Sequence, residues 1–235
     1  MNTLVQYPIP QWMSIAFLIA IPLPFVLITL FVRREATRLQ QHRVFGAVAA
    51  FFIFYLAYIA FASHKGWFDL VSFPPRVLLL TTFPYAVLLF GGLLNTNIYQ
   101  NILKNAPLES LVRLHVFRVI GVFFILLALH DALPKPFAFI AGMGDMLTAV
   151  SSIFVAKAIQ QQKTYARRLT FYWNLFGAAD ILFTAIAANV LTKMSINTGS
   201  MGVDALAMFP FCIIPAFAPP TILFLHWAIF KKISA

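Results

Sequence analysis

Residues 107–131 read PLESLVRLHVFRVIGVFFILLALHD and combine two properties that conflict in a membrane. The segment is apolar and longer than the roughly 20 residues that a helix needs to cross a bilayer, yet Arg118 lies close to its middle. A charged side chain at that depth is costly unless a partner or water meets it. Two partners are available, because Asp145 and Asp180 each lie near the middle of a later apolar segment. The sequence therefore predicts a charged cluster inside the membrane.

The composition of the whole chain agrees with a membrane location. Of the 235 residues, 61% are hydrophobic and only 10% are charged, and the mean hydropathy is +0.86. A soluble domain of this size would expose more charge. The single cysteine, Cys212, excludes an internal disulfide and a cysteine metal cluster. We therefore expect an all-α, polytopic membrane protein.

Runs of about 20 apolar residues divide the chain into seven predicted transmembrane helices. They cover residues 12–32, 44–63, 77–94, 108–131, 136–159, 171–191 and 208–230. The connecting loops are too short for a second folded unit. We therefore expect residues 1–235 to form a single seven-helix transmembrane domain.

The positions of Lys and Arg predict the orientation of these helices. Twelve basic residues fall after the first, third and fifth predicted spans and in the C-terminal tail, whereas only Lys65, Arg76, Lys135 and Lys193 fall on the opposite side. Cytoplasmic loops carry the excess of positive charge, so the N-terminus is predicted outside and the C-terminus in the cytoplasm. The net charge of +10 is then a topology signal. Loops this short form no basic patch for a nucleic acid, so we expect the bilayer as the partner.

Polar residues gather in the last four predicted spans. A rise of about 1.5 Å per residue puts Arg118, Asp145 and Asp180 at one depth near the midplane, with a second polar group about two turns towards the cytoplasm. We therefore predict a charged centre above a polar vestibule that opens inwards. The candidate residues for binding a ligand or ion are Arg118, Asp145, Asp180, Asn174, His115, His226, Thr148 and Trp173.

Helix packing around this site is also predictable. The sequence AGMGD at residues 141–145 supplies small residues that let a second helix come close. In the last predicted span, prolines at 215, 219 and 220 remove backbone donors, which leaves the carbonyls of Phe211, Pro215 and Ala216 without their usual partners. A ligand, a water or a neighbouring side chain can take these carbonyls.

Three functions fit the pattern, and the first is favoured. Two carboxylates against one guanidinium leave one negative charge over, which a proton, a cation or a cationic ligand must neutralise. This predicts a site that binds or translocates a small solute, a proton or a lipid headgroup. The alternatives are an intramembrane metal-assisted hydrolase that uses His115, His226 and an aspartate, and a sensor or assembly subunit whose ion pairs are purely structural. Neither a cofactor nor an oligomeric state follows from the sequence.

A metal-assisted hydrolase would need a third metal-binding side chain at the same membrane depth as His115 and His226. Catalytic zinc usually has three protein ligands, but the histidines separate into an inner pair, His115 and His226, and an outer pair, His64 and His130. We therefore predict no metal site.

The C-terminal half resembles a family of uncharacterised bacterial inner-membrane proteins. The segments that carry the resemblance are VFRVIGVFFIL, FIAGMGDMLTAV, YWNLFGAADILFTA and FPFCIIPAFAPPTILFLH. They match the family's pattern of FRxxG, AGxGD, WNxxGxxD and IPxFxxP with a late histidine. The matching positions are Arg118, Gly121, Asp145, Trp173, Asn174, Gly177, Asp180, Pro215, Pro219 and His226. The resemblance implies a multi-pass protein of the bacterial inner (plasma) membrane and assigns no activity.

Overall fold

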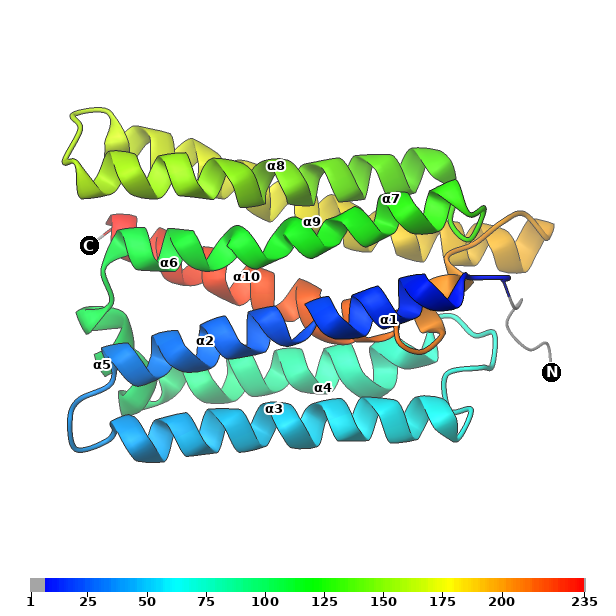
Figure 1. Cartoon of the computed structure of the whole chain (residues 1–235), viewed down its shortest axis with the longest axis horizontal. Coiled ribbons are helices and arrows are strands. Elements are labelled where there is room, and N and C mark those ends of the chain that lie inside the picture. The colour runs from blue at the N-terminus through cyan, green and yellow to red at the C-terminus, as the bar shows by residue number, and fades with distance from the viewer. Residues whose placement is uncertain (1–6, 235) are drawn as a thin grey trace.

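The computed structural model describes residues 7–234, which fold into helices and loops without a β-strand. Seven helical segments in this range are long and apolar enough to cross a membrane, so the prediction of an all-α, multi-pass membrane protein is confirmed (Figure 1). The segments are Gln11–Glu35, Gln41–His64, Leu78–Asn95, Leu108–Leu129, Lys135–Gln160, Ala166–Thr198 and Ile213–Ser234.

Several of these segments are built from shorter elements. The first joins α1 and α2, and the fourth is wound as a 3₁₀ helix, η4, between α6 and α7. The bounds are α1 (Gln11–Ala20), α2 (Pro22–Glu35), α3 (Gln41–His64), α5 (Asn97–Asn105), α6 (Leu108–Leu114), η4 (His115–Gly121), α7 (Val122–Leu129), α8 (Lys135–Gln160), α9 (Ala166–Thr198), η5 (Asp204–Ala207) and α10 (Ile213–Ser234).

Two observed helices differ clearly from the predicted ranges. Helix α9 extends beyond both ends of the predicted range 171–191, because hydropathy marks only its apolar middle. It ends where Gly199 adopts a left-handed backbone with φ +70°, a common helix stop. Helix α10 begins at Ile213 rather than 208, because the preceding residues form η5 and a turn.

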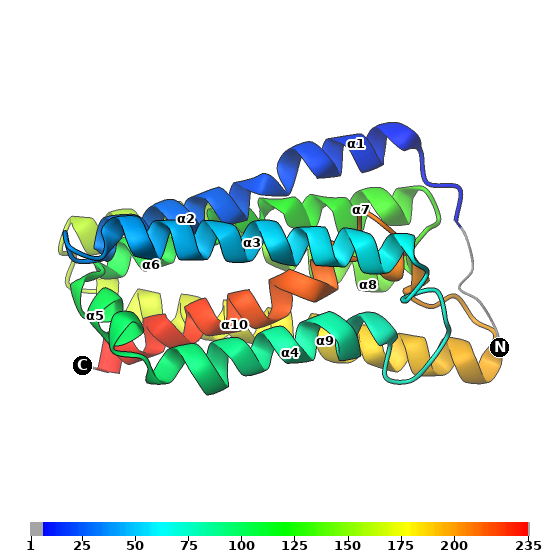
Figure 2. The ribbon, with the colours of Figure 1, turned by 90° about the horizontal axis from the view of Figure 1, so that it is seen from below.

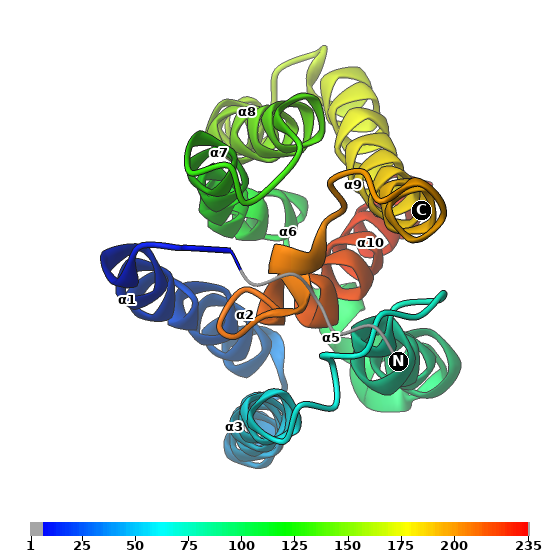
Figure 3. The ribbon, with the colours of Figure 1, turned by 90° about the vertical axis from the view of Figure 1, so that its right-hand side faces the viewer.

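Helix α10 lies near the centre of the bundle, and the other helices surround it (Figure 3). It and the fourth segment are the most buried of the seven. The view in Figure 2 shows that α10 ends at the same end of the bundle as α5 and the α2–α3 connection. We call this the C-terminal end of the bundle, and the end where α1 begins the opposite end. The polar residues of the last four segments are therefore held on the best-packed helices.

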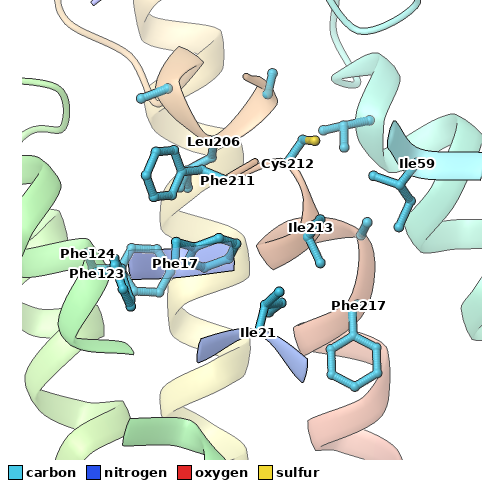
Figure 4. Packing of buried hydrophobic residues seen from close by; sticks show 14 of the residues in the cluster. Phe17, Ile21, Ile59, Phe123, Phe124, Leu206, Phe211, Cys212, Ile213 and Phe217 are labelled. Carbon is cyan, nitrogen blue, oxygen red and sulfur yellow. The ribbon is translucent and has the colours of Figure 1, made fainter. Parts of the chain in front are cut away.

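Aromatic packing fixes the half of the bundle near the opposite end (Figure 4). The Phe17 ring of α1 lies 5.1 Å from the ring of Phe123 and 5.1 Å from that of Phe211. About two turns further along, Phe25 and Phe217 are 4.4 Å apart. Edge-to-face and tilted pairs at these separations are favourable arrangements for aromatic rings. This cluster ties α1 and α2 to α7 and to the start of α10.

The third membrane segment is irregular and packs against the prolines of α10. It consists of η1 (Leu78–Thr82), α4 (Phe83–Ala86), η2 (Val87–Gly92) and η3 (Leu93–Asn95), where η1 and η2 are π-helical turns. Thr82 donates a hydrogen bond of 2.7 Å to the carbonyl of Pro215. From α3, Tyr55 donates one of 2.9 Å to the carbonyl of Ala216. Two of the carbonyls that the prolines leave open are thus taken by neighbouring side chains.

The variant Tyr55→Phe should lower the free energy of unfolding by about 1 kcal/mol, because the carbonyl of Ala216 loses its donor. Thermal unfolding of the purified protein in detergent measures the loss. Tyr58→Phe is the matched control, since its hydroxyl also donates to a backbone carbonyl, that of Leu80, but does so at an exposed position. Equal stability of the two variants would contradict this role for Tyr55.

Candidate functional site

Arg118 lies in the middle of the bundle with no exposed side-chain surface. Its Nε is 2.6 Å from Asp145 Oδ1 of α8, and its Nη2 is 2.6 Å from Asp180 Oδ2 of α9. The two carboxyl groups are almost as buried, with 10% and 8% of their side-chain surface exposed. One guanidinium therefore joins three membrane segments through charge-assisted hydrogen bonds, which are the strong class.

The third nitrogen of the guanidinium contacts two further groups. Nη1 donates to the carbonyl of Gly177 at 3.1 Å and lies 3.1 Å from His226 Nε2. A guanidinium has no acceptor, so Nε2 must accept this hydrogen bond. The proton of a neutral His226 ring therefore lies on Nδ1. All three nitrogens of Arg118 are thus used.

Asn174 fixes the His226 ring in this orientation. Its Oδ1 accepts a hydrogen bond of 2.7 Å from His226 Nδ1, and its Nδ2 donates one of 3.1 Å to the carbonyl of His226. The two contacts assign the amide orientation as well as the imidazole tautomer. A continuous chain of hydrogen bonds therefore runs from Asp145 through Arg118 and His226 to Asn174.

Three glycines let the helices approach closely enough for this chain to form. A Cβ at Gly144 would overlap the carboxylate of Asp180, and one at Gly121 would overlap the Cβ of Asp145. At Gly177, a Cβ would lie 2.7 Å from the His226 ring. The close approach predicted from the AGMGD segment is observed at Gly144. Gly121 of η4 and Gly177 of α9 allow the same close approach.

The 3₁₀ winding of η4 aligns its polar face with the neighbouring helices. Side chains three residues apart eclipse one another in a 3₁₀ helix, so His115, Arg118 and Gly121 share one face. This face packs against α8. An isolated 3₁₀ stretch within a longer helix often marks a hinge or a functional position. Nothing in the apolar sequence HVFRVIG signals the change of winding.

His115 is sealed inside the bundle. Its ring is 4.2 Å from that of His226 and 5.2 Å, edge-on, from that of Trp173. Among the described residues, neither of its ring nitrogens has a hydrogen-bond partner. His115 and Asn174 have no exposed surface, and His226 has 1%. The predicted inward-opening vestibule is therefore wrong for this conformation, in which the three side chains pack against one another.

The other two candidates contact the site without pairing with Arg118. Thr148 is fully buried and donates a hydrogen bond of 2.8 Å to the carbonyl of Gly144 one turn earlier. Trp173 donates one of 3.0 Å to Ser151 Oγ, and its ring covers His115. The structure thus gathers all eight candidates in one region, but the hydrogen bonds of Thr148 and Trp173 go to Gly144 and Ser151 rather than to the charged groups.

A cavity of about 240 Å³ reaches Asp145 from the opposite end of the bundle. Its walls are mostly apolar and come from the loop before η1 and from η1, α4, α7, α8, α9, η5 and α10. The ionisable side chains that line it are Arg76, Asp145 and Asp204. In the sequence of α9, Gly177, Asp180 and Thr184 follow one another at helical spacing, and Thr192 lies on the same line two turns later. Extending this line would have indicated the wall of the cavity, which Thr184 and Thr192 form in part.

The described part of the chain holds no group of three His, Cys, Asp or Glu side chains that could hold a metal ion. His115 and His226 lie together, but Arg118 occupies the space between His226 and both aspartates. The arrangement can hold charge and order hydrogen bonds, and its two carboxylates can take up a proton, whereas the guanidinium between them and His226 stays protonated.

Comparisons with known proteins give one match. Neither a curated protein nor a solved structure matches the chain. A family model described as "Domain of unknown function (DUF8737)" matches residues 74–234, which include all eight candidate residues. Because this range covers more than half of the 235 residues, the chain belongs to that family.

Proposed function

We propose that the protein binds a small organic cation at Asp145 and that the Arg118 cluster couples this binding to a proton. We further propose that it does so in the bacterial inner membrane, with its N-terminus outside and its C-terminus in the cytoplasm. The observation that carries the proposal is that two carboxylates share one guanidinium while one of them, Asp145, borders a cavity.

Charge balance supports a cationic ligand. Asp145 and Asp180 together carry one negative charge more than Arg118 can neutralise. An unpaired charge at this depth is costly, so a proton or a cation should neutralise the remaining negative charge. The formal charges of Arg76 and Asp204 are opposite and cancel, so Asp145 makes the net formal charge of the lining residues negative.

The cavity walls support a solute with an apolar body. Most of the lining side chains are aliphatic or aromatic, among them Phe124, Ile181 and Ile214. A few polar groups that converge within apolar walls are typical of small-molecule sites. The ligand class that fits both features is an amine or quaternary ammonium with a compact apolar group.

Benzyltrimethylammonium, a permanently charged cation with an apolar ring, provides a direct test. We expect the purified protein to bind it at least tenfold more tightly than the neutral isostere in which carbon replaces nitrogen, as measured by calorimetry. Asp145→Asn should remove this preference while the protein stays monodisperse. Asp131→Asn is the control, because Asp131 pairs with Lys135 at an exposed loop and lies outside the cavity.

Two outcomes would contradict the proposal. If the wild-type protein bound both compounds equally, the surplus charge would have no role in recognition. If Asp145→Asn changed stability but not binding, the ion pairs would be structural, as in a sensor or assembly subunit. Metal analysis of the purified protein tests the hydrolase alternative, for which stoichiometric metal lost in His115→Ala would be required.

A further inference from the structure

A second cavity lies towards the C-terminal end of the bundle, where α10 lines it from Thr221 to Ala228, whereas α10 lines the first cavity from Ile214 to Pro219. It has a volume of about 520 Å³, within the usual range for ligand sites. Helices α2, α3, α5, α6 and α10 and the irregular third segment line it. Its walls are nearly all hydrocarbon, for example Phe31, Val48, Leu89 and Phe224. Such walls fit a chain of methylene groups better than a polar solute.

Tyr99 of α5 gives this cavity one unused polar group. The residue is 8% exposed and lines the cavity, and its hydroxyl has no hydrogen-bond partner among residues 7–234. A buried hydroxyl without a partner is unfavourable. Burial raises the pKa of Tyr99 to about 12, so the hydroxyl keeps its proton and can donate it. A ligand with a hydrogen-bond acceptor would therefore satisfy the Tyr99 hydroxyl.

The remaining polar side chains of the lining already have partners. Tyr85 and Thr221 pair with each other at 3.0 Å. Thr96 caps α5 by accepting a hydrogen bond from the backbone N–H of Tyr99 at 3.2 Å, and it donates to the carbonyl of Leu93 at 2.8 Å. Tyr99 is thus the lining residue, within the described part of the chain, that has a free hydrogen-bonding position.

Basic residues follow or precede the lining segments at the C-terminal end. The relevant side chains are Arg33, Arg43, Lys104, Lys231 and Lys232, which we call the basic rim. Lys232 Nζ donates to the carbonyl of Lys104 at 3.0 Å, which links α10 to α5. Two acidic residues lie near these segments, Glu35, which is 3.4 Å from Arg34, and Glu109 in the first turn of α6, and the five basic residues outnumber them. The rim is therefore positive.

We propose that this cavity binds one acyl chain of an anionic phospholipid from the leaflet at the C-terminal end, with the headgroup at the basic rim. The ester or phosphate oxygen accepts the hydrogen bond from Tyr99. Helix α5 suits this position, because Ile98, Tyr99 and Ile102 face the cavity while Asn101 and Lys104 do not line it. Basic pockets between membrane helices are known to bind anionic headgroups.

The proposal is tested by titrating delipidated protein in non-ionic detergent with phosphatidylglycerol and with phosphatidylcholine of the same chains, counting bound lipid by native mass spectrometry. One phosphatidylglycerol should bind in preference to phosphatidylcholine. Lys104→Gln should reduce that preference, whereas Lys157→Gln, an exposed lysine at the same end but outside the cavity, should not. Equal affinity for both lipids would overturn the headgroup assignment.

Tyr99→Phe separates binding from folding. The variant should weaken phosphatidylglycerol binding about two- to tenfold, the value of one net hydrogen bond. The unfolding temperature of the lipid-free protein should stay the same or rise, because the hydroxyl has no hydrogen-bond partner in the described part of the chain. An unfolding temperature that falls while the affinity is unchanged would overturn the role of Tyr99.

Filling the cavity provides the second variant. Val48→Trp places an indole in the cavity and should abolish binding, whereas Ile53→Trp on the same helix, at a position that is 66% exposed, should leave it unchanged. Unchanged binding in a folded Val48→Trp would show that the lipid lies elsewhere on the surface. If Val48→Trp fails to fold, phosphatidylglycerol binding by Tyr99→Phe and by Lys104→Gln decides between the two results.

Discussion

Replacing Arg118 with alanine should lower the free energy of unfolding by about 3–5 kcal/mol, the usual cost of breaking a buried ion pair by removing one partner. Two carboxylates would lose their counter-charge, and the carbonyl of Gly177 and Nε2 of His226 would lose a donor. We therefore expect little folded protein at ordinary growth temperatures. Thermal unfolding and size-exclusion profiles in detergent measure the effect.

The matched control for this variant is Arg113→Ala. Arg113 lies five residues earlier in the same membrane segment, but it is exposed and donates one hydrogen bond, of 3.0 Å, to Gln160 Oε1. Exposed polar pairs contribute about 0–1 kcal/mol, so this variant should unfold like the wild type. A similar loss in both variants would mean that any arginine-to-alanine change in this segment is destabilising.

The aspartate variants should behave differently from Arg118→Ala. Asparagine keeps the size and one acceptor oxygen of the aspartate, and it leaves one carboxylate facing one guanidinium. Asp145→Asn and Asp180→Asn should therefore be tolerated much better than Arg118→Ala. Equal and severe unfolding of all three variants would contradict both the charge balance and the proposed site.

The charged centre could be predicted from the sequence, because burial in a membrane strongly limits where a charged side chain can lie without a partner. An arginine within an apolar span needs a partner, and Asp145 and Asp180 were the two carboxylates at comparable depth. The order of the seven segments followed in the same way from apolar length. Both inferences rest on the cost of charge or of unsatisfied backbone in hydrocarbon, which is large compared with packing differences.

Whether the inner polar residues line a vestibule could not be predicted from the sequence, because depth alone does not distinguish a buried side chain from one that lines a cavity. His115, Asn174 and His226 do lie together, but their rings and amide fill the space between them. The constant rise of 1.5 Å per residue also fails locally, since η4 is wound as a 3₁₀ helix with a rise of about 2.0 Å. Packing, which hydropathy does not encode, decides where space remains.

The two cavities could not be predicted for a related reason. Each is bounded by segments far apart in the sequence, and the third membrane segment contributes to both. Its π-helical turns are irregular elements that apolar runs do not reveal. A hydroxyl such as that of Tyr99, which has no hydrogen-bond partner within residues 7–234, becomes informative only when its neighbours are known.

Gly144→Ala should be the most damaging single-methyl change, with a loss of about 3 kcal/mol or more. Its Cβ would overlap the Asp180 carboxylate that binds Arg118, so the methyl group would have to separate α8 from α9 or displace the ion pair. Gly46→Ala is the control, because no atom of residues 7–234 outside its own helix turn lies within 4 Å of a Cβ at that position of α3. The control should be neutral or slightly stabilising, since alanine favours a helix over glycine by about 1 kcal/mol.

A double-mutant cycle distinguishes this steric cause from a general effect of Gly144. Asp180→Ala removes the atoms that the methyl group would overlap and leaves Arg118 balanced by Asp145. The variant Gly144→Ala/Asp180→Ala should therefore be more stable than the sum of the two single changes predicts, by at least about 1 kcal/mol, as expected for residues in contact. Strict additivity would place the cost of Gly144→Ala elsewhere in α8. A favourable coupling would show that the space at Gly144 exists to admit the Asp180 carboxylate to the charged centre.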